Sequence, residues 1–548
     1  MAGLLALFMA AGPAFAQQGQ APQAPATTQT QTAPAPPTPA GTARSLQLDT
    51  GIELGQTLAV ETPPVAENAI QLSLERAIEL ALANNLDVVL QRFERQRARL
   101  GVLQALGLYD LRLEGNLRAS DSSQETDNPF QLATQNTRGV LVELSQLTPT
   151  GGDISIGLDN RRTEATLQNG ESFGEYNSDV TFGLFQPLLR GFGRNNVERQ
   201  LLLARTDSLL SLQQFEAQVN TTIQAVSDAY WNLAEANLQL QVARESLNLA
   251  QELHNRNKIE VEVGTRPPLD LVQSEAAIAE REVEIIQAQT NIGNAEDNLR
   301  LLLNLPAEGQ YWNLPIRTTT DPAGGRISID LPAALQTAFQ ERSELRTQGL
   351  NIERAEVEAA FLRNQTLPEL NLNVEYNLAG TGAGLNETFR DIRGIDFDGW
   401  SALLQFSVPL QNRAARAAST IADLTVESAQ TQRDLVQAQI TNEVRQAARN
   451  VESAAQTIEA ARASREFQER NLEAERKRYE NGMSTSFQIT QIQEDLTQAR
   501  QREVTAIINY RRAVTEFYRA TGQLLDEEGI ELLDPEQEIN RFEFSLFR

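Results

Sequence analysis

The side chains that could do chemistry are few in this chain of 548 residues, and they do not form a catalytic set. Cysteine is absent, which excludes a disulfide framework, a thiolate metal site, a catalytic thiol and an acylated N-terminal cysteine. The one histidine, His254, falls at a helix seam position, where a lone His is usually structural, and we assign it no role. Because no nucleophile, base and orienting group recur at catalytic spacing, and no phosphate-binding glycine loop occurs, we predict a non-enzyme without a cofactor.

Two acidic pairs could in principle bind a metal: Glu260 with Glu262, and Glu494 with Asp495. Neither pair is accompanied by His or Cys, and neighbouring acids on an exposed helix are usually just solvated, so we predict no metal site. The formal charge of −26 argues against a nucleic-acid partner. This charge would suit a conduit whose inner wall favours cations, or it would serve the solubility of a large surface.

The elements that must position any site are long helices. From about 195 to 263, residues at one seam position recur every seven places, and mostly small residues follow three places later, which is a sustained heptad. The first set is Leu212, Val219, Val226, Leu233, Leu240 and Leu247, and the second is Phe215, Thr222, Ala229, Ala236, Ala243 and Ala250. At about 1.5 Å per residue this run extends roughly 100 Å, so its partner must be another long helix.

A second copy of the arrangement follows without a gap when the chain is shifted by 218 positions. The shift lays Val226 on Val444 and the glycine Gly264 on Gly482. Each copy is then a long helix, a glycine turn and a returning helix, which is an αα-hairpin. We therefore predict two repeats of one continuous architecture instead of several unrelated domains.

The chain ends differ in composition from the repeats. Residues 1–16 end in the small-x-small pattern of an export signal peptide, and 17–71 predict a disordered or extended leader. Residues 523–548 form an acidic tail. Beyond the signal peptide no stretch approaches the roughly 20 apolar residues of a membrane helix, so a membrane span would have to be a barrel.

Each repeat combines an opening helix, strands and a hairpin. The first repeat covers 72–304, with a helix at about 74–107, strands at about 109–187 and a hairpin at 195–304; a crossover follows at 305–330. The second repeat covers 331–522, with a helix at about 331–365, strands at about 369–409 and a hairpin at 411–521. Each returning helix is half as long as its partner, and stacking it on the opening helix would close the bundle along its height.

The strands are predicted where the hydrophobic period changes from 3.6 to 2. Six such segments occur, for example Leu370–Leu378 and Trp400–Val408. A water-soluble sheet with one buried face shows the same alternation, so the pattern alone does not choose lipid over a core. Long polar loops at 120–137, 163–176 and 379–399, with a short turn at 148–152, are typical of an outer-membrane barrel. Six strands are too few to enclose a channel, so several copies must contribute.

The sequence resembles the TolC-like outer-membrane efflux proteins over about 72–524. The motifs that carry the resemblance are YENGMSTSFQITQIQEDLTQAR with the downstream YRATGQL, VEVGTRPPLDLVQSEAAIAER, FQPLLRGFGR and AIELALANN. The resemblance implies an α+β fold in which a homotrimer shares a β-barrel in outer-membrane lipid, continued by a long α-helical barrel through the periplasm. It also implies two partners, a periplasmic adaptor and, through it, an inner-membrane RND or ABC transporter.

The resemblance also implies a closing site at the periplasmic tip. The turns at Gly264 and Gly482 would form the tip and the docking place of the adaptor, and Tyr479 would contact Asp270 to hold the pore shut. Where the best-known member has a ring of aspartates, this chain has Gln488 and Gln491, so a carboxylate gate and its block by divalent cations are not expected. The basic residue expected two places after Gly482 is a serine, Ser484.

The sequence leaves several alternatives open. The family generally contributes four strands per protomer, so the extra hairpin at about 138–162 either adds two strands or projects as an extracellular flap. The cargo is either small molecules such as drugs and toxic compounds, or proteins in type I secretion. Competing classes are a structural or adhesive trimeric coiled coil at the cell surface and a soluble periplasmic scaffold, and the first of these should lack the doubled helix-sheet-helix plan.

Overall fold

The computed structural model describes residues 65–66, 68–125, 128–306 and 311–530, which fall within one compact unit, Leu58–Pro535. The expected signal peptide, most of the expected leader and the end of the expected tail lie outside the described residues. Within the described ranges, none of the helices carries an apolar stretch long enough to cross a bilayer.

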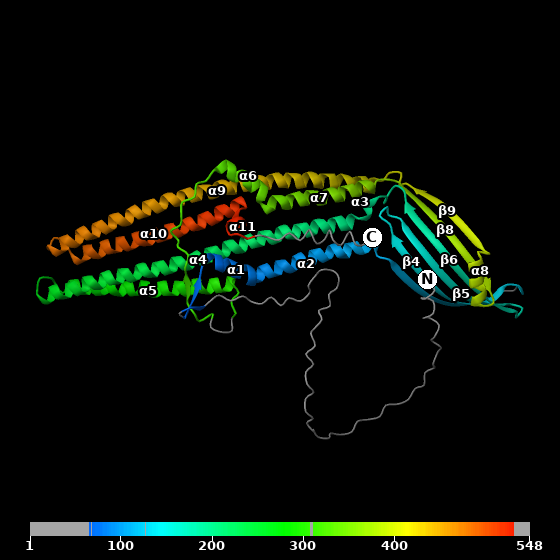
Figure 1. The fold of residues 1–548 in the computed structure, drawn as a ribbon, viewed down its shortest axis with the longest axis horizontal. Coiled ribbons are helices and arrows are strands. Elements are labelled where there is room, and N and C mark those ends of the chain that lie inside the picture. The colour runs from blue at the N-terminus through cyan, green and yellow to red at the C-terminus, as the bar shows by residue number, and fades with distance from the viewer. Residues whose placement is uncertain (1–64, 67, 126–127, 307–310, 531–548) are drawn as a thin grey trace, which may run out of the picture. The chain divides into compact units, whose positions relative to one another are not determined.

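The long helices pair as two hairpins, which run side by side in Figure 1. Their bounds are α4 Arg199–Glu262 with α5 Leu269–Leu302, and α9 Arg413–Glu480 with α10 Ser486–Thr521. The predicted seam residues are buried in them: Val226 and Leu233 on α4, and Val444 and Val451 on α9. The heptad interpretation and the doubled plan are thus confirmed, because the same seam positions face the interior in both repeats.

The opening helix of each repeat is broken in two, whereas the sequence predicted one continuous helix. The four pieces are α1 Leu74–Asn84, α2 Leu86–Leu106, α6 Leu331–Glu341 and α7 Ser343–Asn364. A short 3-10 turn, η1 Gly107–Tyr109, follows α2, and further one-turn helices are α3 Arg194–Val197 and α11 Leu524–Glu527. As predicted, α2 lies beside α4 and α7 beside α9, in line with the shorter returning helices (Figure 1).

The breaks have a tertiary cause that periodicity does not show, and the break at Asn85 also has a local one, because its side chain caps the start of α2. Asn85 and Arg342 are both extended at the break, and each donates a side-chain hydrogen bond to the end of a returning helix. The Asn85 amide reaches the carbonyl of Leu302 at 3.0 Å, and the Arg342 guanidinium reaches the carbonyl of Ala520 at 3.1 Å. The last carbonyls of a helix have no partner within it, so each break supplies one.

A small sheet, which the sequence did not predict, joins the segment before the first repeat to the crossover. Its strands are β1 Val65–Ala66, β2 Ala69–Leu72 and β7 Ile316–Thr318, in the order β1-β2-β7. Buried Tyr230 of α4 fixes this sheet, because its hydroxyl donates to the carbonyl of Leu72 and accepts the amides of Thr319 and Thr320. The end of the expected leader and the crossover are therefore ordered against the helices.

The six predicted strands are present and form one antiparallel sheet. They are β3 Arg112–Ser123, β4 Leu132–Leu147, β5 Asp153–Leu167, β6 Ser172–Pro187, β8 Glu369–Gly382 and β9 Asp398–Ser407, in the order β3-β4-β5-β6-β8-β9. The extra hairpin is β4 with β5, and it is paired between β3 and β6 within the sheet, not projecting as a flap.

The long polar loops predicted at 120–137 and 163–176 are wrong in length. The strands continue through most of both stretches, and β5 and β6 are joined by only 168–171. Polar side chains there pair across the strands, as with the hydroxyls of Thr166 and Ser172 at 2.9 Å, so the ladder does not need apolar residues. The third predicted loop, 379–399, contains a helix, α8 Leu385–Gly394.

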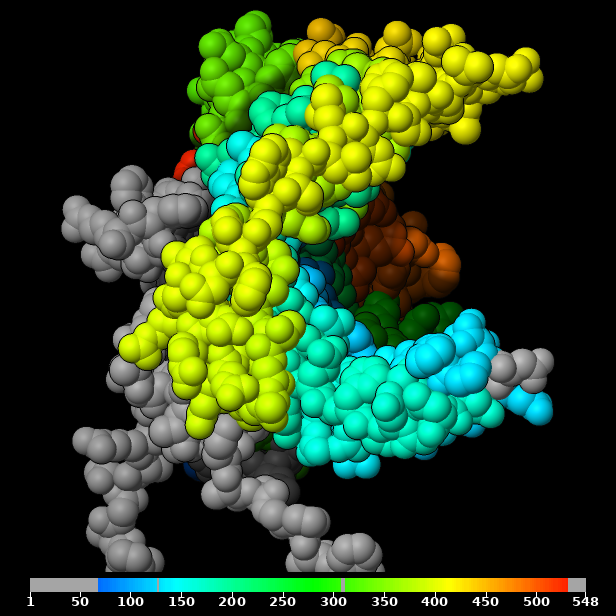
Figure 2. Space-filling model, turned by 90° about the vertical axis from the view of Figure 1, so that its right-hand side faces the viewer, coloured from blue at the N-terminus to red at the C-terminus, as the bar shows by residue number. Residues whose placement is uncertain are grey.

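One face of the sheet is apolar and exposed. The register aligns one residue from each strand into a continuous row: Leu113, Leu144, Ile156, Phe182, Tyr376 and Trp400. The row next to it in sequence points to the other face and is polar: Arg112, Ser145, Ser155, Gly183, Glu375 and Ser401. Figure 2 shows the sheet as a curved wall with a hollow side. We call the face that carries the first row the apolar face.

Candidate functional site

The two hairpin turns have the same backbone construction. Gly264 and Gly482 have φ values of +79° and +73°, a left-handed conformation that glycine adopts without strain. At each turn the glycine amide bonds the carbonyl three residues back, and the next amide bonds the carbonyl five residues back, as in Thr265 to Glu260 at 2.9 Å. This pattern is the Schellman motif, which satisfies the last carbonyls of the long helix and reverses the chain.

Tyr479 lies at the centre of the contacts between the two turns. Its side chain is 1% exposed, and its hydroxyl donates to Oδ1 of Asn257 on α4 at 2.5 Å. The Asn257 amide donates in turn to the hydroxyl of Ser486 at 2.8 Å and to the backbone carbonyl of Asp270 at 3.3 Å. Burial raises the pKa of Tyr479, so the hydroxyl stays a donor well into alkaline solution.

Arg266 ties the first turn to the second. Its guanidinium lies 3.9 Å from the centroid of the Tyr479 ring, a cation–π contact. It donates to the backbone carbonyls of Ser484 and Tyr479, both at 3.2 Å, and to the carboxylate of Glu260 at 3.0 Å. The Asp270 carboxylate lies 3.9 Å from the same guanidinium. We refer to Tyr479, Asn257, Arg266 and Asp270 as the tip cluster.

The expected pair of Tyr479 and Asp270 is therefore brought together through intermediaries. The hydroxyl of Tyr479 bonds Asn257, and the Asp270 carboxylate faces Arg266. When the two repeats are aligned by the shift of 218 positions, Arg266 is equivalent to Ser484, the position where the resemblance implied a basic residue. The basic side chain at this turn thus comes from the first repeat in place of the second.

The two glutamines lie outside the tip cluster. Gln488 is the third residue of α10 and forms a capping box with Thr485, whose hydroxyl accepts the Gln488 amide while Gln488 Oε1 accepts the Thr485 amide. Gln491 is exposed and donates to Asp495 at 3.4 Å. The local role of Gln488 is thus to start the returning helix.

Sequence reasoning missed three residues of this region. Asn257 continues the heptad seam seven places after Ala250, and a polar residue at a seam position is a signal that could have singled it out. Arg266 could have been found from its repeat equivalence with Ser484. The buried carboxylate of Glu475, which accepts the hydroxyl of Ser484, had no sequence signal that we can identify.

The other candidate residues have ordinary contacts. His254 Nδ1 lies 3.0 Å from the hydroxyl of Ser274 on α5. Glu260 pairs with Arg266, and Glu494 pairs with Arg281, so both acidic pairs are engaged by arginine. Among the described residues, no group of three or more His, Cys, Asp or Glu side chains is placed to hold a metal ion.

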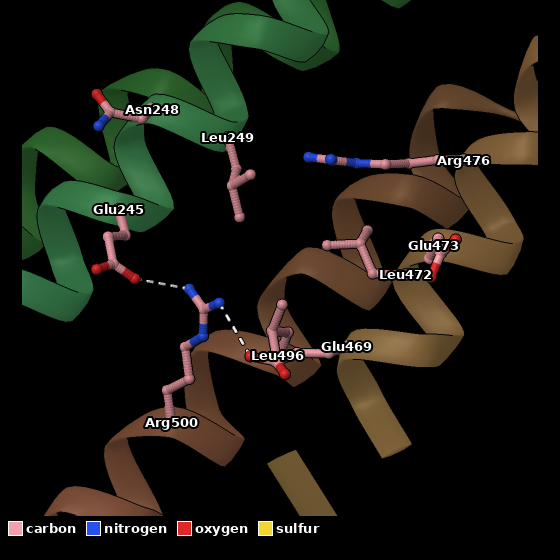
Figure 3. A pocket seen from close by; sticks show the side chains of 9 residues that line it. All are labelled: Glu245, Asn248, Leu249, Glu469, Leu472, Glu473, Arg476, Leu496 and Arg500. Atoms are coloured by element: carbon pink, nitrogen blue, oxygen red, sulfur yellow. Dashed lines mark hydrogen bonds and ion pairs between the residues drawn. The ribbon is translucent and has the colours of Figure 1, made fainter. Parts of the chain in front are cut away.

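A groove lies between the two hairpins beside the tip cluster. It is a hollow of about 350 Å³ lined by residues of α4, α9 and α10 (Figure 3): Glu245, Asn248, Leu249, Glu469, Leu472, Glu473, Arg476, Leu496 and Arg500. Arg500 donates to Glu245 at 2.8 Å and to Glu469 at 3.1 Å and so bridges the hairpins (Figure 3). Leu472 and Leu496 belong to the same buried cluster as Tyr479, so the groove and the tip share packing.

The chain matches one protein family by sequence and several outer membrane channels by structure. Residues 77–305 and 334–523 match the family model described as outer membrane efflux protein. No curated protein matches the sequence. The CmeC outer membrane channel of Campylobacter jejuni is 16% identical and covers 87% of this chain and 89% of its own, with a TM-score of 0.61. VceC of Vibrio cholerae is 14% identical over 82% of this chain and 96% of its own, with a TM-score of 0.61.

The open state of the MtrE outer membrane channel of Neisseria gonorrhoeae has the same fold. It is 15% identical and covers 87% of this chain and 98% of its own, with a TM-score of 0.59. At these identities the likeness concerns the fold. The family match covers both repeats and includes the tip cluster, the groove and the sheet.

Proposed function

Because the chain belongs to the outer membrane efflux protein family, we propose that it is the exit duct of a tripartite export system. In this role it receives cargo from an inner-membrane transporter and passes it across the periplasm and the outer membrane. The observation that carries the proposal is the pair of matched hairpins, joined at one end by the tip cluster and connected at the other to a sheet with one exposed apolar face. The doubled helix-sheet-helix plan is the one that a coiled-coil adhesin should lack.

A homotrimer is the assembly that we propose. In the described structure β3 pairs only with β4 and β9 only with β8, so both sheet edges offer unpaired backbone groups. An open edge in lipid would leave those groups unsatisfied, and pairing β9 of one copy with β3 of the next satisfies them. Three copies then close an eighteen-stranded sheet from six strands each, wide enough to enclose a channel.

The tip cluster is our candidate for the closing site of the periplasmic end. Its contacts join α4, the first turn, α9 and the start of α10, so separating the hairpins would break them together. Arg266 takes the place of the basic residue missing at Ser484. With Gln488 and Gln491 in place of aspartates, closure rests on these polar contacts and on packing, without a carboxylate ring.

The groove beside the turns at Gly264 and Gly482 is our candidate docking place for a helical hairpin of a periplasmic adaptor. It has a leucine floor and walls with both signs of charge, which suits a partner helix with an apolar stripe flanked by charges. Since Leu472 and Leu496 pack in one cluster with Tyr479, an inserted hairpin would push on the packing that holds the tip. The adaptor connects the duct to an RND or an ABC transporter.

The cargo that we propose is small molecules, including drugs and toxic compounds, with protein export as the alternative. The test is a host lacking its own outer-membrane duct, supplied with this chain and with either an RND pump and its adaptor or an ABC transporter and its adaptor. Restored resistance to small toxic compounds supports the first cargo, and secretion of a protein substrate supports the second. A trimer that restores neither, and that forms no conducting pores in planar bilayers, would overturn the proposed function.

A further inference from the structure

The helix α8 packs on the apolar face of the sheet, although it belongs to the loop between β8 and β9. A Cβ atom built on Gly380 would lie 2.1 Å from the carbonyl oxygen of Thr388, so α8 covers the side toward which residue 380 points. Strand alternation puts that side on the same face as Leu378 and Tyr376. The buried hydroxyls of Thr388 and Ser178, 2.8 Å apart, fasten the helix there.

The sheet register shows at which position along the strands α8 contacts the sheet. The aromatic row contains Phe182, Tyr376 and Trp400, and the row two residues farther from the long helices contains Leu158, Val180 and Leu378. On β5, β6 and β8 the row after that is Asn160, Ser178 and Gly380, where the apolar side chains stop and α8 begins. On β3 and β4 the same row still carries Leu117 and Val140. The helix therefore lies at the boundary of the apolar face, at the end away from the long helices (Figure 1).

The composition of α8 suits such a boundary. Leu385, Phe389 and Ile392 are half-buried toward the sheet, while Asn386, Arg390 and Arg393 form an exposed stripe at helical spacing. Among the residues that the structure describes, neither Arg390 nor Arg393 has an ion-pair partner, although many other arginines of this acidic chain do. The carboxylate of Glu387 accepts the amide of Ala383.

Apolar side chains that follow α8 in the sequence are exposed to solvent. Ile395 and Trp400 are each more than half exposed, and Ile395 ends α8 in the left-handed conformation, at φ +55°. A β-branched residue is rare in that conformation, so the turn is held by its surroundings. An exposed Trp on the same face as unpaired arginines is the pattern of a membrane interface, where Trp and Tyr rings sit at headgroup depth.

We propose that α8 is an interfacial anchor, resting in the headgroup region of the outer leaflet with Arg390 and Arg393 bound to the phosphate groups of anionic lipids. The inference rests on the outer-membrane placement in the proposed function. A second copy of the chain is the weaker candidate for this surface, because α8 lies over β6 and β8, away from the free edge of β9. The arginines supply charge complementarity to phosphate, and the neighbouring apolar side chains continue the apolar face.

The placement of α8 is tested by measuring its depth in a bilayer. Because the sequence contains no cysteine, one introduced cysteine can be labelled specifically. The full-length protein carrying Asn386→Cys with a nitroxide label is reconstituted into vesicles of phosphatidylcholine and phosphatidylglycerol, and its accessibility to oxygen and to a water-soluble nickel chelate is measured. Leu404→Cys on the apolar face and Asn373→Cys on the polar face mark the acyl and aqueous limits. An intermediate depth supports the anchor, whereas bulk-water accessibility, or protection from both reagents by a protein contact, overturns it.

Lipid binding tests the chemistry. The protein in detergent is titrated with phosphatidylglycerol, lipid A or phosphatidylcholine, and bound lipid is counted by native mass spectrometry. Arg390→Gln with Arg393→Gln should weaken binding of both anionic lipids about fivefold per arginine, leaving phosphatidylcholine unchanged. The matched pair Arg118→Gln with Arg413→Gln removes the same charge from exposed positions elsewhere and should have no effect.

Equal binding by the double variant and its control would overturn the anchor, and so would displacement of the lipid by millimolar inorganic phosphate, since the site would then select a free anion. Channel conductance is measured on the same preparations. If the wild-type trimers conduct but fail both the depth measurement and the lipid titration, only the anchor is overturned. If the wild type does not conduct, the proposed function itself is overturned.

Discussion

The hydroxyl of Tyr479 on α9 donates a 2.5 Å hydrogen bond to Oδ1 of Asn257 on α4, joining two long helices whose residues are 222 positions apart. Both side chains are buried. Because Asn257 also bonds Ser486 and the backbone of Asp270, one amide connects four segments at the tip. A buried network in which every member is satisfied stabilises one arrangement strongly and is sensitive to the loss of any member.

Removing the Tyr479 hydroxyl should loosen the closed tip without disturbing its packing. Tyr479→Phe keeps the ring under Arg266 but leaves Asn257 Oδ1 without its donor, which costs roughly 1 to 3 kcal/mol of closure. We expect higher single-channel conductance in planar bilayers and greater sensitivity of whole cells to large antibiotics. Tyr510→Phe, which removes another buried hydroxyl far from the turns, is the control and should behave as wild type. Equal conductance in all three proteins would remove Tyr479 from the closing site.

Arg266 should matter more than Asp270. Arg266→Gln removes the cation over the Tyr479 ring and the donors to two backbone carbonyls, whereas Asp270→Asn changes a carboxylate 3.9 Å from that guanidinium. We expect both variants to leak ions, with the larger conductance in Arg266→Gln. Arg266→Lys should also leak, because an ammonium cannot reproduce the forked contacts. Arg256→Gln, which breaks an exposed ion pair with Glu480, controls for charge, and a leak of the same size there would argue against a specific role.

Closure should weaken at high pH through Tyr479. Burial holds the pKa of this phenol above its ordinary value of 10.0 in the closed tip, while a solvated Tyr in an opened tip keeps the ordinary value. The stabilisation from the neutral phenol is thus fully present below pH 10 and is lost as the pH rises through the raised pKa. Conductance measured from pH 8 to 11 should stay flat and then increase in wild type. Tyr479→Phe should lack the alkaline increase, and an identical increase in that variant would assign it to another group.

Docking in the groove should fail when its edge is made bulky or its charge is reversed. Asn248→Trp enlarges one lining residue of α4, and Glu473→Arg changes the sign of one wall (Figure 3). Both side chains are exposed, so the trimer should form normally while small-molecule export with an adaptor and pump drops. Glu427→Arg, an exposed position elsewhere on α9, is the matched control. Full export by both groove variants would show that the adaptor binds elsewhere.

Much of the fold could be predicted because its periodicities are local. The buried seam positions, such as Val226 on α4 and Val444 on α9, follow from spacing alone, and so does the alternation along Leu370–Leu378. Both are observed. The break at Asn85 carries a local signal, because Asn is a preferred N-cap residue and its side chain caps α2. The helix break at Arg342 could not be predicted, since its side chain bonds a carbonyl 178 residues away. Helix α8 was missed for a related reason: it is held by Thr388 against Ser178, a contact that exists only in the folded sheet.

The candidate site was predicted in part. Gly264, Gly482, Tyr479 and Asp270 lie at or beside the turns, as position in the repeat implied. The partner of the Tyr479 hydroxyl could not be assigned from the sequence, because the seam register shows only that Asn257 faces a neighbouring helix and not which side chain it meets. Gln488 was a gate candidate by position, yet its contacts with Thr485 place it in a capping box, a role that the ST-x-x-Q spacing permits in any helix.

Divalent cations should not block the wild-type channel, because no carboxylate stands at the two positions where the resemblance implied a ring. Gln491 is exposed, and its hydrogen bond to Asp495 is long at 3.4 Å, so Gln491→Asp should be tolerated without disturbing α10. In a trimer this change brings three carboxylates around one axis, and hard divalent cations prefer such oxygen ligands. We expect millimolar Mg²⁺ or Ca²⁺ to reduce the conductance of Gln491→Asp and to leave the wild type unchanged. Gln498→Asp, two turns farther along α10, gives the same charge change as a control, and a blocked wild-type channel would contradict the uncharged gate.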